Sequence, residues 1–288
     1  MRPSTPTVAS HSHSLLLLIV ALAVLAGCEA ILPTVPDLEP DNPLDPDSPS
    51  FVIPETTLLS GPSEGETVNT SGVTFSWEGN AGATVFQTRF TGEDWTTWSP
   101  TKTRSLEYLE EGLYQFEVRS GYPNAGGGAT YYDLTPASVN FTVDAVPASS
   151  VRLSPLLVET GISSTFDVLV VAEDVEDLMG ARLELRFGPA ALQCTAVEIG
   201  GFLSSNSGTV LSQTFTDNAL GSIGINLAVA GASPSGVSGS GILAIVRFQA
   251  LSVVDTSISL HPGGTTLRDS DNLSIVISQL VGSEVRIR

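Results

Sequence analysis

The sequence contains few basic residues. Only 12 of its 288 residues are Lys or Arg, against 31 Asp or Glu, which gives a formal net charge of −19, and Lys102 is the single lysine. Binding to nucleic acid requires a basic surface that neutralises phosphates, and adsorption to anionic lipid requires clustered Lys and Arg. The composition therefore excludes nucleic acid as a partner. It also argues against attachment to a membrane through charge.

Histidine and cysteine are equally scarce, with three and two residues. Of the histidines, His261 lies in "LHPGG". The proline and the two glycines of this segment predict a turn. A lone histidine there forms neither a metal cluster nor a catalytic triad. Carboxylates are plentiful, but no motif pairs two of them for glycoside hydrolysis. We therefore expect no catalytic residue, no metal site and no cofactor, and hence no enzyme.

No apolar run is long enough to span a bilayer as a helix, which takes roughly 20 residues. Residues 15–26, "LLLLIVALAVLA", follow a polar segment with Arg2, the layout of a secretory signal peptide. The next residues complete "LAGC" at 25–28, which resembles the lipobox of bacterial lipoproteins. That resemblance implies cleavage before Cys28, its lipidation, and an extracytoplasmic protein held at the membrane by lipid alone. Secretion with an incidental cysteine is the alternative.

The residues after Cys28 predict the cellular location of the protein and the order of its domains. Glu29, where aspartate favours retention in the inner membrane, leaves the outer membrane or cell surface open. Residues 28–50 combine the lipidated cysteine with a Pro- and Asp-rich tether that cannot bury enough surface to fold. The predicted organisation is a signal peptide at 1–27, this tether at 28–50, and folded domains at 51–146 and 147–288. Cys194 then has no partner, and we expect it to be buried.

Residues 51–146 show short alternating runs such as "VTFSW", "LYQFEV" and "VNFTV", which predict a β-sandwich. "LEEGLYQFEVR" resembles the tyrosine-corner region of immunoglobulin-like and fibronectin type III-like modules, with Tyr114 as the corner residue. The resemblance implies a spacer or an adhesive unit. Trp95 and Trp98 in "EDWTTWSP" are candidates for stacking on sugar rings, but packing within the module is the favoured interpretation.

Residues 147–288 alternate almost without interruption, in about nine runs that include "FDVLVVAED", "ARLELRF", "GSIGINLAVA" and "GILAIVRFQAL". Nine strands without a long helix predict a second sandwich of jelly-roll type, so the expected fold class is all-β. Four segments give this domain its resemblance to the cohesin family: "VRLSPLLVETGISSTFDVLVVAED", "LMGARLELRFGPAALQCTAVEIGGFL", "GSGILAIVRFQAL" and "TTLRDSDNLSIVISQLVGSEVRI". The resemblance covers residues 148–288.

The cohesin resemblance implies docking of a dockerin, a small helical module that carries its own calcium, on a flat sheet face. It assigns the outward residues of three neighbouring strands to this site. They are Arg182, Glu184 and Arg186; Asn226 and Ala228; and Leu243, Ile245 and Arg247. Many cohesins carry asparagine and aspartate where Gly180 and Arg182 stand here, so the partner is expected to be a divergent dockerin or another protein. "RDSDN" at 268–272 does not fit a calcium loop, because Ser274 and Leu280 stand at its glycine and glutamate positions.

Two alternatives to docking remain open. The jelly-roll fold also occurs in carbohydrate-binding modules, so polysaccharide is an alternative ligand, but residues 148–288 contain no Trp or Tyr. Their phenylalanines are expected to face inward. A surface adhesin without a specific ligand is the second alternative. A link to polysaccharide degradation is implied only by the family.

Overall fold

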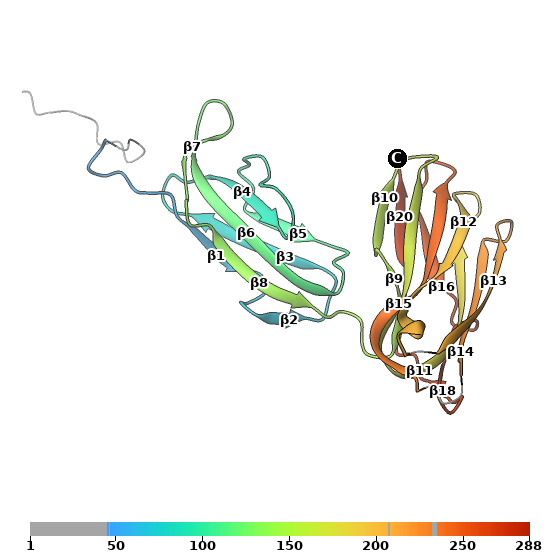
Figure 1. The fold of residues 1–288 in the computed structure, drawn as a ribbon. Helices are drawn as coiled ribbons and strands as arrows, with labels where there is room; N and C mark the ends of the chain where they lie inside the picture. The colour runs from blue at the N-terminus through green and yellow to red at the C-terminus, as the bar shows by residue number, and fades with distance from the viewer. Residues whose placement is uncertain (1–44, 46, 207, 232–234) are drawn as a thin grey trace, which may run out of the picture. The chain divides into compact units, whose positions relative to one another are not determined.

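The computed structural model describes residues 45, 47–206, 208–231 and 235–288 (Figure 1). Apart from the 3₁₀ turn η1 (Phe202–Asn206), every regular element within these residues is a β-strand, which confirms the predicted all-β fold class. The chain divides into Met1–Val52 and Ile53–Arg288. The predicted signal peptide, Cys28 and most of the tether lie outside the described residues. No helix in the described part is long and apolar enough to cross a membrane.

The strands between residues 56 and 143 form two sheets around an aromatic core. The first sheet has the order β1 (Thr56–Ser60), β3 (Val73–Gly79) and β5 (Thr103–Leu106). The second has the order β2 (Glu66–Val68), β8 (Ala137–Val143), β6 (Gly112–Pro123) and β4 (Val85–Phe90), with β7 (Ala129–Tyr132) beside β6. The core between the sheets includes Phe75, Trp77, Phe86, Phe116 and Phe141.

Tyr114 occupies the place that the sequence indicated for a corner residue. Its hydroxyl donates a hydrogen bond to the carbonyl of Glu110, four residues upstream, at 3.0 Å. The ring stacks on Phe90 with 4.9 Å between centroids. A tyrosine that bonds backwards in this manner fixes the connection into the following strand. The immunoglobulin-like assignment and the predicted boundary at residue 146 stay predictions.

The strands from residue 150 onward surround a separate aliphatic core. The main order across their sheet is β10-β20-β16-β11-β14-β13. The first six elements are β9 (Ser150–Ser154), β10 (Leu157–Thr160), β11 (Thr165–Phe187), β12 (Leu192–Ile199), β13 (Thr209–Asp217) and β14 (Ser222–Ala230). The others are β15 (Val237–Ala250), β16 (Thr256–Leu260), β17 (Thr266–Asp269), β18 (Ser274–Ile275), β19 (Leu280–Val281) and β20 (Ser283–Ile287).

Strand β11 is 23 residues long and joins the two sides of this sandwich. Its first half pairs with β9 and β15, and its second half pairs with β14, β16 and β17. The sequence predicted two strands here. Register shifts on either side of Val175, with positive φ angles at Asp174 and Asp177, bend the strand without ending it. Bulges of this kind redirect a strand, and aspartate tolerates the left-handed conformation.

The second half of β11 has the predicted alternation. Ala181, Leu183 and Leu185 are buried in the core, whereas Arg182 and Arg186 are exposed. Cys194 on β12 is also buried, with 6% of its surface exposed, and burial raises the pKa of its thiol. The prediction of which β11 residues point inward and which point outward is therefore confirmed.

Candidate functional site

The outward side of β17, β11, β14 and β13 forms one continuous surface, which we call the outer face. Directly opposed residues of antiparallel strands point to the same side of a sheet, so the register identifies its members. From β11 these are Gly180, Arg182, Glu184 and Arg186, and from β14 they are Ser222, Gly224, Asn226 and Ala228. From β13 they are Leu211, Gln213, Phe215 and Asp217, and from β17 they are Thr266 and Arg268.

The register arranges these side chains in rows that run across the strands. Thr266, Arg182, Asn226 and Gln213 form the central row. The row on one side contains Glu184, Gly224 and Phe215, and the row on the other side contains Arg268, Gly180, Ala228 and Leu211. The pairing of Arg182 with Asn226 and of Gly180 with Ala228 brings two predicted strands together as expected.

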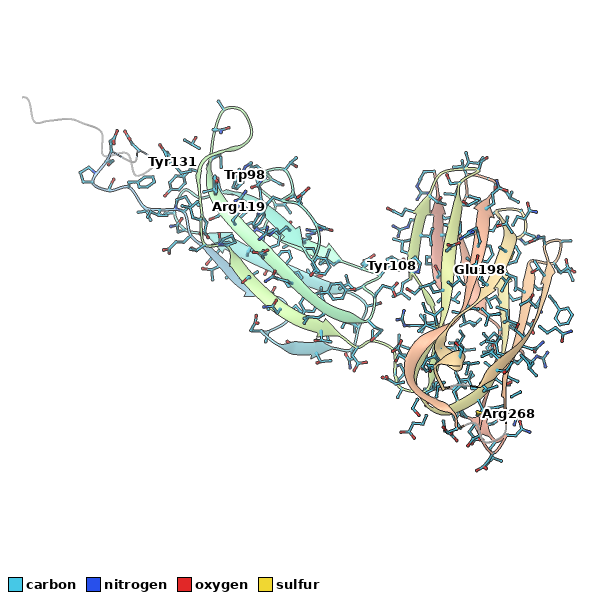
Figure 2. All side chains as sticks on the ribbon, in the orientation of Figure 1. Trp98, Tyr108, Arg119, Tyr131, Glu198 and Arg268 are labelled. Atoms are coloured by element: carbon cyan, nitrogen blue, oxygen red, sulfur yellow. The ribbon has the colours of Figure 1, made fainter. Side chains whose placement is uncertain are left out.

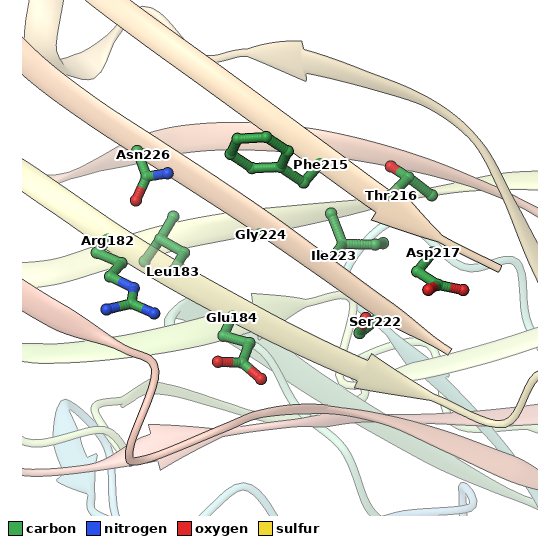
Figure 3. A pocket seen from close by; sticks show the side chains of 10 residues that line it. All are labelled: Arg182, Leu183, Glu184, Phe215, Thr216, Asp217, Ser222, Ile223, Gly224 and Asn226. Carbon is green, nitrogen blue, oxygen red and sulfur yellow. The ribbon is translucent and has the colours of Figure 1, made fainter. Parts of the chain in front are cut away.

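Two of the hollows on the outer face lie one on each side of the central row. The first encloses about 410 Å³ and lies between Glu184 and Phe215, where Gly224 contributes no side chain (Figure 3). The second encloses about 390 Å³ and lies over Gly180 and Ala228. Arg182 and Asn226 line both hollows. The small residues thus leave two depressions with a polar ridge between them.

Glu184 is the acidic group that β11 contributes to the outer face, and it is already partnered. Its carboxylate pairs with Arg186, and it lies 3.7 Å from Nδ1 of His261 in the turn after β16. A Cβ at Gly264 would lie 1.9 Å from the Glu184 carboxylate, so only glycine lets this turn pass so close. The turn therefore covers one side of Glu184 and leaves 19% of its side chain exposed.

Arg182 and Arg268 differ from Arg186 in having no carboxylate partner among the described residues. Arg268 donates one hydrogen bond to the carbonyl of Asn272 at 3.1 Å. In a chain with a net charge of −19, two such guanidinium groups on one face are notable. Arginine has five N–H donors and no acceptor, so this face presents donors to a ligand.

The predicted positions of Leu243, Ile245 and Arg247 on this face are wrong. These residues belong to β15, which pairs with the first half of β11 and with β12. Leu243 is only 1% exposed. Arg247 pairs with Asp167 at 2.7 Å, and this bond holds the pKa of the Asp167 carboxyl below its usual value. The error arises because β11 changes sides near Val175, so the neighbours of its first half are not neighbours of its second half.

The outer-face residues of β13 and β17 were not predicted from the sequence. All residues of β13 except Val210 are exposed, so no buried set distinguishes its two sides. Leu211 and Phe215 are each 57% exposed, and Phe215 corrects the expectation that the phenylalanines of this domain face inward. The alternation of Leu211, Gln213 and Phe215 in "TVLSQTFTD" was the available signal.

The tryptophans of the first sandwich are engaged within the protein. The guanidinium of Arg89 lies 4.7 Å from the centre of the Trp95 ring, and that of Arg119 lies 4.3 Å from it. Arg119 also lies 4.4 Å from the Tyr132 ring, which contacts Trp98. Figure 2 labels Arg119 and Trp98 in the same part of the first sandwich. Cation–π contacts of this kind stabilise a sheet surface. The arrangement agrees with the packing interpretation of Trp95 and Trp98.

No family model and no curated protein matches the chain. Solved cohesin structures are similar to part of it. A non-cellulosomal cohesin from Archaeoglobus fulgidus is 19% identical with a TM-score of 0.39, covering 49% of this chain and 92% of its own. A type II cohesin from the cellulosome of Acetivibrio cellulolyticus is 20% identical with a TM-score of 0.40, covering 48% and 95%. The sixth cohesin of scaffoldin B from the same organism, solved with a dockerin mutant, is 15% identical with a TM-score of 0.42, covering 49% and 100%.

Proposed function

We propose that this chain is an extracytoplasmic lipoprotein that docks a partner protein of dockerin type on its outer face. The observation that carries the proposal is the pair of hollows separated by Arg182 and Asn226 on a regular sheet surface. Protein interfaces concentrate their binding energy in a few side chains that fill such depressions, with arginine and aromatic residues enriched among them. Phe215 and Arg182 supply both types at the first hollow.

The chemistry of the outer face defines what the partner has to offer. Arg182 and Arg268 require acceptors, such as carboxylates or carbonyl oxygens. Leu211 and Phe215 require apolar contacts beside them. A helical module with acidic and apolar side chains on one face meets both requirements, and calcium enters only as part of such a partner. Recruitment for polysaccharide degradation is one use of this docking.

Docking can be tested by capture on the immobilised full chain from secreted and envelope proteins of the source organism. We expect a protein with two 12-residue calcium loops, retained with calcium and released by EDTA. Arg182→Glu should reduce the retention of this protein at least about tenfold. The substitution replaces a hydrogen-bond donor with a carboxylate, which repels the acceptor groups of the partner. The matched control is Arg247→Glu, the same change on the other side of the sandwich, which should leave capture unchanged. Equal capture by the wild type and Arg182→Glu would contradict docking on this face.

Carbohydrate is the alternative ligand that the same assay addresses. Phe215 is an exposed aromatic residue on the outer face, and aromatic rings stack on sugars. If polysaccharide is the ligand, soluble polysaccharide added to the capture assay will displace the captured material from the immobilised chain. EDTA will then leave the amount of captured material unchanged. Competition by sugar without calcium dependence would replace the dockerin proposal.

The proposed anchor is the lipidated Cys28, with residues 28–50 as spacer, at the outer membrane or cell surface. Its support is the sequence "LAGC" after a short apolar run. We expect cells fed radiolabelled palmitate to label the wild-type chain, and Cys28→Ser to abolish the label and release the protein from the membrane fraction. Cys194→Ser is the control, because that thiol is buried. A Cys28→Ser chain that stays in the membrane fraction would show that the anchor lies elsewhere.

A further inference from the structure

Strand β13 lies at the end of the sheet and has only one neighbour. The strand order ends at β13, and its nine residues pair with β14 alone. The opposite edge of β13 therefore presents backbone N–H and C=O groups that no described strand pairs. Such an edge is a template for another strand.

Other edges of this sandwich carry features that discourage pairing, and β13 does not. β10 is four residues long and contains Glu159. β12 has a register shift between Cys194 and Ala196 that interrupts its edge. In contrast, β13 follows a regular register along its whole length, contains no proline or lysine, and has a single charged residue, Asp217, at its end. Sheets usually protect a long regular edge with charges, proline or bulges, so the exception requires an explanation.

The sequence of β13 is complementary to itself. In an antiparallel pair of two copies centred on Gln213, all nine residues are paired, and Thr209 lies opposite Asp217 of the second copy. Leu211 then lies opposite Phe215 of the second copy, and the symmetry repeats this contact. Cross-strand pairs of aromatic and aliphatic side chains stabilise antiparallel sheets. No acidic residue faces another across the pair.

We propose that two copies of this chain associate through β13, antiparallel and centred on Gln213. The chain's own tether is a poor occupant, because its frequent prolines lack the N–H groups that a ladder needs. A second copy supplies both the backbone groups and the apolar contacts. The twofold axis is perpendicular to the sheet, so the two outer faces lie side by side and point the same way. This inference goes beyond the proposed function and does not depend on it.

A disulfide across the symmetry axis tests the register. In the pair, residue 213 lies opposite residue 213 of the second copy, with Cα atoms about 4.5–5.5 Å apart, which suits a disulfide. We expect Gln213→Cys in the full chain in detergent to form a covalent dimer under mild oxidation. Thr209→Cys is the matched control, because it is exposed on the same strand but lies about 27 Å from its counterpart. The unsubstituted chain reports any dimer formed through Cys28.

A charge exchange provides a second, independent measurement. Gln213→Lys or Gln213→Glu places like charges opposite each other, so each variant alone should sediment as a monomer at concentrations where the wild type forms a dimer. An equal mixture of the two variants should restore the dimer. Monomeric wild type at every concentration, or equal cross-linking of Gln213→Cys and Thr209→Cys, would overturn the proposal. Docking, which is tested through Arg182, could still hold in that case.

Discussion

Replacement of Phe116 with alanine is expected to lower the free energy of unfolding by about 3–5 kcal/mol. The Phe116 side chain is fully buried between the two sheets of the first sandwich. Its ring stacks on Phe75 with 4.0 Å between centroids and lies 5.8 Å from the ring of Trp77. Alanine would remove these contacts and leave a cavity that rigid aromatic neighbours cannot fill.

Urea denaturation followed by tryptophan fluorescence measures this loss, since the chain's three tryptophans lie in this part of the sequence. Leu113→Ala is the control, because Leu113 lies on the same strand and is 72% exposed. Its effect should stay within about 0.5 kcal/mol. Calorimetry of Phe116→Ala also tests the predicted boundary at residue 146. Separate domains require that only one of two transitions shifts, and a single shifted transition would contradict that division.

The second large effect is expected for Leu183→Ala, which should cost about 2–5 kcal/mol of unfolding free energy. Leu183 is fully buried in the aliphatic core, directly beneath the outer face. It pairs with Ile225 of β14, which is also fully buried. Alanine at this position removes core contacts while leaving every outward side chain in place.

Arg182→Ala is the matched control for this substitution, one residue away on the same strand. Its effect on stability should stay within about 0.5 kcal/mol, because its side chain points to solvent. The two variants should behave in the opposite way in the docking assay. Folded Leu183→Ala should retain the partner, and Arg182→Ala should lose it. If Arg182→Ala destabilises the chain as much as Leu183→Ala, the division of β11 into inward and outward sides is wrong.

The local pattern of β11 and β14 was predictable because each strand has one buried side. The period-two alternation from Ala181 to Phe187 identified the core residues directly. Placing Asn226 and Ala228 beside this strand required long-range information, which the cohesin resemblance supplied. The observed register agrees with that placement.

The position of β15 was not predictable in the same way. Alternation shows which side of a strand is buried, but it contains no information about the sheet to which the strand belongs. The shift at Val175 moves β11 from one side of the sandwich to the other within one continuous strand. Strand β13 presents the opposite difficulty, because a strand exposed on both sides has no buried set. Alternation puts Leu211 and Phe215 on the same side of β13, and the register with β14 shows that this side belongs to the outer face.

The continuity of β11 has a mechanical consequence. A partner on the outer face would pull on the second half of β11, while the chain enters this sandwich through β9, which is bonded to the first half at Leu169–Glu173. Hydrogen bonds between antiparallel strands lie perpendicular to the strands, so a force directed along them loads all bonds of the ladder together. A single covalent backbone thus joins the point of attachment to the point of load. If the proposed anchor and the proposed docking face are both in use, tension between them is carried by this one strand, without crossing the packed interface between the two sides of the sandwich.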